Sequence, residues 1–160
     1  MTDAGQPLTH LDEAGHARMV DVSAKDVSAR QARATGRVLL SAEAIAALRA
    51  GRVPKGDALA VARIAGIQGA KRAPDLIPLC HPIALHGVAV ELAVQEDAVA
   101  ITATVRTADR TGVEMEALTS VTVAALALID MVKAVDPAAV ISDVRVEEKT
   151  GGKTGSWRRP

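Results

Sequence analysis

Hydrophobic side chains recur at every second position in four stretches of this chain, a spacing typical of strands with one buried face. The stretches are residues 33–40, 88–94, 99–105 and about 140–149. The polar residues 95–97, between the second and third stretches, suit a hairpin turn. In the last stretch, Val144 and Val146 point one way and Arg145, Glu147 and Lys149 the other.

Three other segments have the spacing and the end signals of helices. Ser41 is typical of the N-cap of a short helix. Residues 57–72 predict a second helix, in which Gly66 and Gly69 each cost about 1 kcal/mol relative to alanine. Such glycines often mark the close approach of another backbone or of a ligand. The clearest helix is 114–133, with an apolar stripe at Leu118, Val121, Ala125, Leu128 and Val132.

The order of these elements predicts an α+β fold. It is the β-α-β-β-α-β plan of ferredoxin-like domains, an antiparallel sheet with helices packed on one face. Residues 74–82 contain three prolines and cannot be helical throughout. We expect residues 1–17 to be a mobile N-terminal segment, 18–150 the catalytic domain, and 151–160 a flexible Gly/Lys-rich tail.

Composition narrows the class of protein. The chain has 160 residues, one tryptophan and no phenylalanine or tyrosine, so its core depends on small aliphatic side chains, and this favours an oligomer. Its 19 basic and 19 acidic residues balance, which argues against nucleic acid or an anionic membrane as a partner. Cys80, the only cysteine, excludes an internal disulfide and a multi-cysteine metal site. A polar N-terminus leads us to expect a cytoplasmic protein.

The C-terminal stretch EEKTGGKTGSW, residues 147–157, contains the residue types of a phosphate-binding P-loop. The spacing does not fit, because the position that requires the first glycine is Glu147 and too few residues follow for a helix. Two interpretations remain. The stretch is a flexible basic tail, or it is a cationic flap that closes over an anionic ligand.

Charged residues on the long helix suggest either surface ion pairs or acid–base chemistry. Helical geometry places Glu116 and Asp130 opposite the apolar stripe, and Asp130 and Lys133 are spaced to meet. The pair is either a surface salt bridge or a couple that shuttles protons. Fourteen residues separate Glu116 from Asp130, or about 21 Å of helix, so one small group cannot contact both from the same helix.

His81 lies in the proline-rich stretch, on a stiffened loop. It is either a structural histidine or an imidazole that binds a heterocycle or relays a proton. The histidines at 10, 16, 81 and 86 fit no zinc-ligand spacing. Basic residues scattered along the chain are each explained as surface charge, but converging in one cleft they would match a triphosphate. They are Lys25, Arg30, Lys55, Lys71, Arg72, Lys149 and Lys153.

Six blocks of this sequence together resemble the molybdenum cofactor biosynthesis protein C family, the cyclic pyranopterin monophosphate synthases. They occur in the family's order and cover nearly the whole chain from about residue 8. They are MVDVSAK (19–25), KGDALAVARIAGIQGAKR (55–72), DLIPLCHPI (75–83), TGVEMEALT (111–119), DMVKAV (130–135) and KTGGKTG (149–155). The chain departs from the family's pattern at Arg110, where relatives often have lysine, and at Val53-Pro54.

The resemblance implies a function and an assembly. The family is similar to ferredoxin folds and forms a homohexamer, a trimer of dimers, with active sites at subunit interfaces. Its substrate is 3′,8-cyclo-7,8-dihydroguanosine 5′-triphosphate, and its products are cyclic pyranopterin monophosphate and diphosphate. We expect no cofactor and no protein-bound metal site, with a divalent ion such as Mg²⁺ left open.

The resemblance also implies which residues form the site. Asp130 and Lys133 match the family's catalytic aspartate and lysine. Matches to substrate-binding or basic active-site positions are Lys25, Arg30, Lys55, Leu79, Cys80, His81, Glu114, Met115, Glu116 and Lys149. We expect Lys153 to join Lys149 in neutralising phosphates. Two other classes stay open: a non-catalytic module that senses a nucleotide or amino acid at its subunit interfaces, and a structural assembly subunit.

Overall fold

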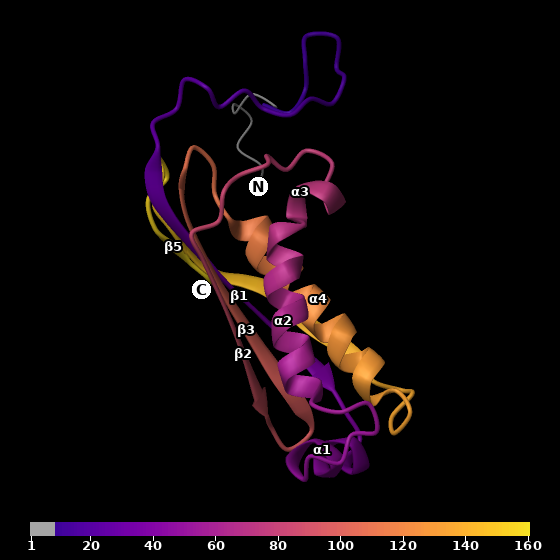
Figure 1. Ribbon diagram of the computed structural model, residues 1–160. Helices are drawn as coiled ribbons and strands as arrows, with labels where there is room; N and C mark the ends of the chain where they lie inside the picture. Colours follow the sequence, from indigo (N-terminus) through magenta and orange to yellow (C-terminus); the bar gives the residue numbers. More distant parts are fainter. Residues whose placement is uncertain (1–8) are drawn as a thin grey trace.

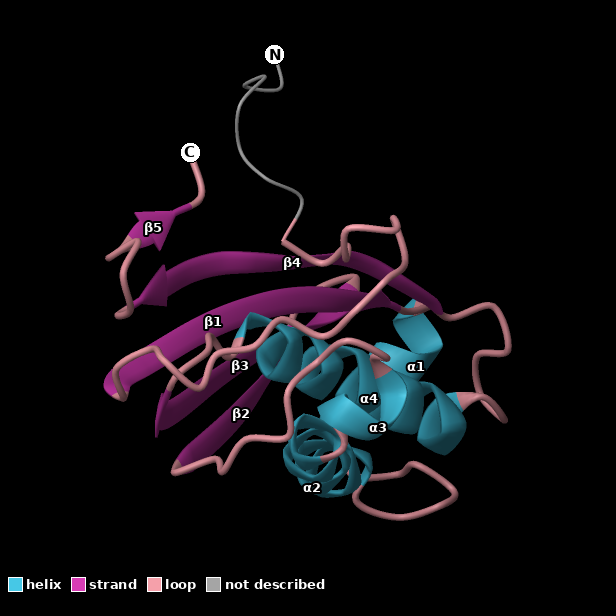
Figure 2. Ribbon diagram, turned by 90° about the horizontal axis from the view of Figure 1, so that it is seen from above, coloured by secondary structure: helices cyan, strands magenta, loops and turns pink. Residues whose placement is uncertain are grey.

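The computed structural model describes residues 9–160, so the first part of the expected N-terminal segment, residues 1–8, lies outside the described residues. An antiparallel sheet forms one layer and the helices cover one of its faces (Figures 1 and 2). The strands are β1 (Ser28–Leu39), β2 (Gly87–Val94), β3 (Ala98–Asp109), β4 (Val140–Thr150) and β5 (Trp157–Arg158). The helices are α1 (Ala42–Arg49), α2 (Ala58–Lys71), α3 (Ala73–Leu76) and α4 (Glu114–Val132).

The strand order β2-β3-β1-β4-β5 confirms the ferredoxin-like prediction, with β1 and β3 in the middle and β5 added at one edge. β1 begins at Ser28, five residues before the predicted start at residue 33, because it pairs with β3 as far as Asp109. The tail expected to be flexible contains β5, which pairs with Glu148 and Lys149 of β4. That pairing was not predicted, and the mobility of residues 151–160 stays a prediction.

Local signals place the helix ends where the sequence predicted them. The Ser41 hydroxyl accepts the backbone N–H of Ala44, and the Asp57 carboxylate accepts that of Ala60. Each contact satisfies one of the amide groups that a helix start leaves free. In the proline-rich stretch only the four residues of α3 are helical, with Pro74 in its first turn. The residues between α3 and β2 therefore form the loop that carries His81.

Glycines let α2 and α4 approach each other closely. A Cβ atom at Gly66 would lie 3.0 Å from the backbone oxygen of Ser120, and one at Gly69 would lie 2.7 Å from Cβ of Val123. This confirms the prediction that these glycines mark a close approach of backbones. α4 is the one helix within residues 9–160 that is long and apolar enough to cross a membrane, but 56% of its apolar window is buried within the domain. It is the core helix of this fold.

Two β-bulges interrupt the pairing of β1 with β4, and one of them corrects a prediction. At Glu147, β4 has one more residue than β1, so the alternation of inward and outward side chains inverts beyond that point. Lys149 consequently pairs with Ala32, which is fully buried under the helices. The prediction that Lys149 shares a face with Arg145 and Glu147 is wrong because of this bulge.

Replacing Gly69 with alanine should destabilise the domain, although alanine is the better helix former. The gain in helix propensity of about 1 kcal/mol is outweighed by overpacking against Val123, for a net loss of about 1–2 kcal/mol in the free energy of unfolding. Chemical denaturation of Gly69→Ala measures this loss. The exposed neighbour Gln68 supplies the control, since Gln68→Ala should stay within about 0.5 kcal/mol of wild type.

The double variant Gly69→Ala/Val123→Ala tests the cause, because it removes the side chain that the new methyl group would meet. Its loss should be smaller than the sum of the two single losses. A Gly69→Ala protein at least as stable as wild type would show that the two helices separate without cost.

Candidate active site

A pocket of about 430 Å³ lies where the first turn of α4 meets two loops. One loop is the segment before β1, and the other is the proline-rich loop after α3. The structure brings seven of the predicted site residues to this pocket. They are Lys25, Leu79, Cys80, His81, Glu114, Met115 and Glu116.

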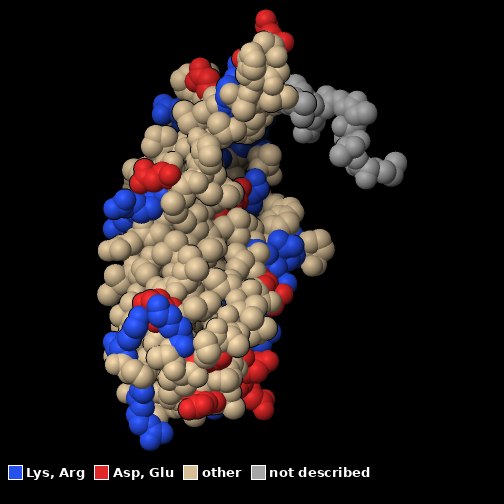
Figure 3. Space-filling view, turned by 90° about the vertical axis from the view of Figure 1, so that its right-hand side faces the viewer, with Lys and Arg blue, Asp and Glu red and all other residues tan. Residues whose placement is uncertain are grey.

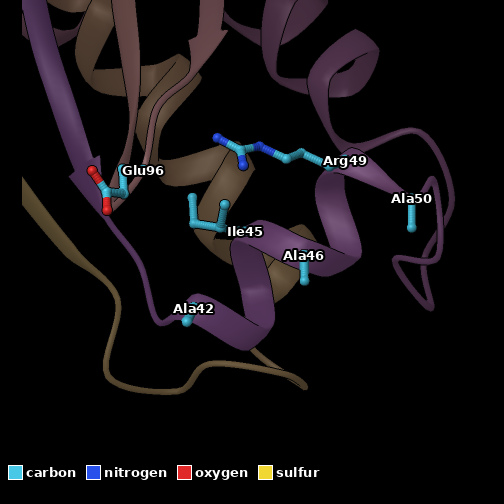
Figure 4. Close-up of a pocket in the computed structure, with 6 residues that line it drawn as sticks. All are labelled: Ala42, Ile45, Ala46, Arg49, Ala50 and Glu96. Atoms are coloured by element: carbon cyan, nitrogen blue, oxygen red, sulfur yellow. The ribbon is translucent and has the colours of Figure 1, made fainter.

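Two other hollows of similar volume contain none of the predicted site residues. One lies against α1, where Ala42, Ile45, Ala46 and Ala50 line it and the side chains of Arg49 and Glu96 reach its edge (Figure 4). The other lies on the sheet face away from the helices, between β1, β3 and β4. Neither combines an imidazole, a thiol and acidic groups, so the pocket at the start of α4 is the candidate site.

Glu116 is the most deeply buried acid of this pocket, with only 2% of its surface exposed. The Cys80 thiol donates a hydrogen bond to its Oε1 atom at 3.4 Å, while Oε2 has no partner. Burial raises the pKa of Glu116, and the neighbouring Glu114 adds to the effect. Helical geometry predicted Glu116 opposite the apolar stripe, and the loop carrying Cys80 covers that side of the helix and buries the carboxyl group.

Cys80 is a hydrogen-bond donor in this site and not a nucleophile. Burial, together with the negative charge of Glu116, raises the pKa of its thiol to about 12. The thiol therefore stays protonated at neutral pH. The loop around it is fixed to β3, because the Thr107 hydroxyl donates to the carbonyl of Ala84 and the His86 amide donates to that of Arg106.

The segment before β1 crosses the pocket and is tied to both of its walls. A ring nitrogen of His81, Nε2, lies 2.5 Å from the carbonyl oxygen of Val20. On the other side, the Arg110 guanidinium donates to the carbonyl of Lys25 at 2.9 Å. These contacts hold Lys25 at the pocket. His81 therefore binds the segment before β1 as well as lining the cavity.

The C-terminal end of β4 brings a second lysine to the site. Because of the bulge, Lys149 faces α4 and its Nζ lies 3.3 Å from the Glu114 carboxylate. Gly152 lies so close to the guanidinium of Arg30 that a Cβ would overlap it. Lys153 is exposed in the turn that follows. Lys25 lines the pocket and Lys149 contacts Glu114 of α4, while Arg30 lies beside Gly152 and donates from its Nε to the carbonyl of Asp109. The convergence of these groups on one anion stays a prediction.

The two predicted catalytic residues lie at the other end of α4. Asp130 accepts the Lys133 ammonium group at 2.7 Å and that of Lys55 at 2.9 Å. Hydrogen bonds from Lys133 first, and then from Lys55, lower the pKa of Asp130 to about 2. The predicted Asp130–Lys133 pair is confirmed, and Lys55 joins it. One chain therefore divides the predicted site between two ends of a 19-residue helix.

Some pocket residues were not predicted from the sequence. Val20 and Val22 line it, and so do Thr111 and Gly112 just before α4. The Glu114 carboxylate folds back over Gly112, where a Cβ atom would overlap it. A glycine two residues before a helix with two acids in its first turn was the available signal. Within residues 9–160 no three His, Cys, Asp or Glu side chains cluster as metal ligands would, and the expectation of no cofactor stays a prediction.

Fold and pocket together define an α+β protein with a candidate small-molecule site at the start of α4. Comparison with known proteins identifies the kind: the profile of the MoaC family matches residues 19–152. The chain is 69% identical over 157 residues to the cyclic pyranopterin monophosphate synthase of Streptomyces coelicolor, covering 98% of this chain and 92% of that protein. It is 64% identical to the protein of that name from Nocardioides sp., over the full length of both. The chain belongs to the MoaC family.

A more distant relative supports the same assignment. Cyclic pyranopterin monophosphate synthase 2 of Mycobacterium tuberculosis H37Rv is 57% identical over 152 residues, which cover 95% of this chain and 91% of that protein. The family resemblance drawn from the sequence blocks is therefore confirmed.

The Asp130 carboxylate should keep its charge in acid. We expect its carboxyl ¹³C resonance not to titrate between pH 8 and about 3, because two ammonium groups favour the ionised form. Since the folded-state pKa of about 2 lies below the ordinary 3.8, these contacts stabilise the fold above that value. Their contribution is lost as the pH falls through 2.

Removing one ammonium group should move this titration. Lys55→Ala should raise the pKa of Asp130, while Lys71→Ala, at an exposed position at the end of α2, should not. A wild-type Asp130 that titrates at or above its ordinary value would contradict the observed contacts.

Proposed function

We propose that this chain is a cyclic pyranopterin monophosphate synthase of molybdenum cofactor biosynthesis. It converts 3′,8-cyclo-7,8-dihydroguanosine 5′-triphosphate into cyclic pyranopterin monophosphate and releases diphosphate. The observation that carries the proposal is the pocket at the start of α4, which joins the family's LCH and ME segments in one cavity. Relatives that share up to 72% of their residues with this chain carry the name of that enzyme.

Phosphate chemistry accounts for the basic residues. Closing a cyclic monophosphate on the sugar forms one phosphorus–oxygen bond and breaks another, and the diphosphate that leaves carries negative charge. Cations held in advance near that oxygen stabilise the charge as it develops. Lys25 at the pocket, Lys149 beside Glu114 and Arg30 beside Gly152 would do this, with Lys153 joining from the exposed turn. This favours the interpretation of the tail as a cationic flap over that of a flexible basic tail.

Rearrangement of the ring system needs proton transfer, and the Lys55–Asp130–Lys133 cluster supplies candidate groups. With a pKa of about 2, Asp130 is a carboxylate at neutral pH and cannot donate a proton there. In our proposal it orients the ammonium group of Lys133, which moves the proton. His81 and Glu116 would hold the base and the sugar in the pocket at the other end of α4.

Because the two groups of site residues lie about 21 Å apart along α4, the proposal requires a second copy of the chain. We propose that the α4 end carrying Lys133 in one subunit completes the pocket at Glu116 of another, in a hexamer built as a trimer of dimers. The helix-covered side supports an assembly, since a broad part of it lacks charged side chains (Figure 3). Val61, Ile64 and Leu126 are exposed on α2 and α4.

We further propose that the reaction takes place in the cytoplasm and needs no resident cofactor. The substrate is a small molecule, and neither nucleic acid nor a membrane takes part. Adding a chelator to the purified enzyme separates a requirement for Mg²⁺ from a metal-free reaction, since only the former loses turnover.

Substituting Lys133 should separate binding from turnover. Lys133→Ala should retain the substrate but lose at least about 100-fold in kcat, because a proton carrier contributes about 10²–10⁴-fold. Product formation by wild type, Lys133→Ala and the control Arg49→Ala, at an exposed position of α1, is measured by mass spectrometry. Wild type that binds the nucleotide without converting it would identify a sensing module, and wild type that does not bind it would identify a structural subunit.

Mixed oligomers test the shared site. Glu116→Gln and Lys133→Ala should each be inactive alone. When subunits of the two variants are exchanged at equal amounts, about a quarter of the wild-type activity should return. A working site needs an intact Glu116 from one subunit and an intact Lys133 from another, and about half of the subunits can supply each. Glu43→Gln, at an exposed acid of α1, is the matched control for the glutamate change and should stay active. No recovery after proven subunit exchange would place both ends in the same subunit's site and overturn the shared arrangement.

A further inference from the structure

Cys80 and Glu116 form a pair at the wall of the pocket that proton transfer by the lysine cluster does not explain. The thiol donates to Oε1 of Glu116 at 3.4 Å, from the loop after α3 to the first turn of α4. Only 2% of the surface of Glu116 is exposed, yet its Oε2 atom has no protein partner. A buried carboxyl oxygen without a partner costs about 1–3 kcal/mol unless a ligand satisfies it.

The geometry points to Cys80 as a positioning residue that acts through Glu116. Because Oε1 already accepts the thiol proton, a proton taken up by the carboxyl group resides on Oε2, the buried oxygen that has no protein partner. Cys80 thereby determines which oxygen of Glu116 contacts the bound molecule and whether that oxygen carries a proton. The inference rests on the proposed function for the identity of that molecule, but not for the pairing itself.

The surroundings of Glu116 suit this role. Burial raises its pKa and Glu114 adds to the rise, while a hydrogen bond from its own backbone N–H and a smaller contribution from the Cys80 thiol oppose it. The thiol stays protonated at neutral pH, so its proton is available to donate to Glu116. The other titratable or charged groups that face this part of the pocket are His10, Lys25 and His81, with Lys149 paired to Glu114.

Ligand contact and positioning predict different behaviour at Cys80. If the thiol only touched the substrate, its loss would raise KM and leave the pH dependence of kcat unchanged. If it positions Glu116, its loss should move the Glu116 titration in the resting enzyme, before any substrate is added. The conservative change Cys80→Ser keeps a donor at the same place and should restore most of the wild-type behaviour.

The test follows the Glu116 carboxyl ¹³C resonance in the full-length protein, assigned by its absence in Glu116→Gln. Cys80→Ala should raise the pKa of Glu116 by about half to one pH unit, the effect of losing one hydrogen bond to the charged form. Cys80→Ser should shift it by less than half as much. The pH profile of kcat should move in the same direction. An unchanged Glu116 titration in Cys80→Ala would overturn the inference.

Two further measurements keep the outcome clear. If Cys80→Ala fails to fold, the S–H stretching band of wild type reports the bond directly. It should lie below the frequency of a free thiol and rise in Glu116→Gln, and a band at the free-thiol frequency would overturn the pairing. A shifted Glu116 titration in Cys80→Ala supports the positioning role even if wild type forms no cyclic monophosphate, a result that would contradict only the proposed function.

Discussion

The close packing of α2 on α4 is the constraint on which the rest of this structure depends. With no phenylalanine or tyrosine, the domain cannot fill a wide interior, and Gly66 and Gly69 let the two helix backbones approach each other instead. The largest fully buried side chains are accordingly aliphatic, with Ile101 and Leu128 among them. Once α4 is fixed in this way, its two ends are fixed too, and each end carries part of the predicted site.

The distribution of charge follows from that arrangement. The start of α4 holds a buried acid, and its end holds an exposed carboxylate between two ammonium groups. Carboxyl groups therefore have opposite tendencies at the two ends: burial raises the pKa of Glu116, and nearby cations lower that of Asp130. Such a contrast is typical of sites where one acid can hold a proton and another must remain an anion.

Much of the fold could be predicted from the sequence because its signals are local. Alternation along β2 and β3, the cap at Ser41 and the apolar stripe of α4 depend on neighbouring residues alone, and the structure agrees with each. The glycines inside the predicted helix 57–72 likewise indicated the close approach of a neighbouring segment. The Asp130–Lys133 pair belongs to this class, since three residues of helix bring the two side chains together.

The remaining features depend on contacts between distant segments. The burial of Glu116 results from a loop 36 residues earlier in the chain, which helical geometry cannot reveal. Lys55 reaches Asp130 across 75 residues, and β5 returns to β4 through a turn with left-handed glycines. Resemblance to the family indicated which residues matter, but not which of them share a cavity within one chain.

Because of the bulge at Glu147, the face of the sheet on which Lys149 lies depends on whether the number of residues before it in β4 is odd or even. Because side chains in a strand alternate, adding or removing a single residue between Val146 and Lys149 would turn the lysine away from the helices and toward the solvent. Two residues together would leave its direction unchanged. Among chains of this architecture, we therefore expect the spacing of that segment to vary in steps of two or not at all.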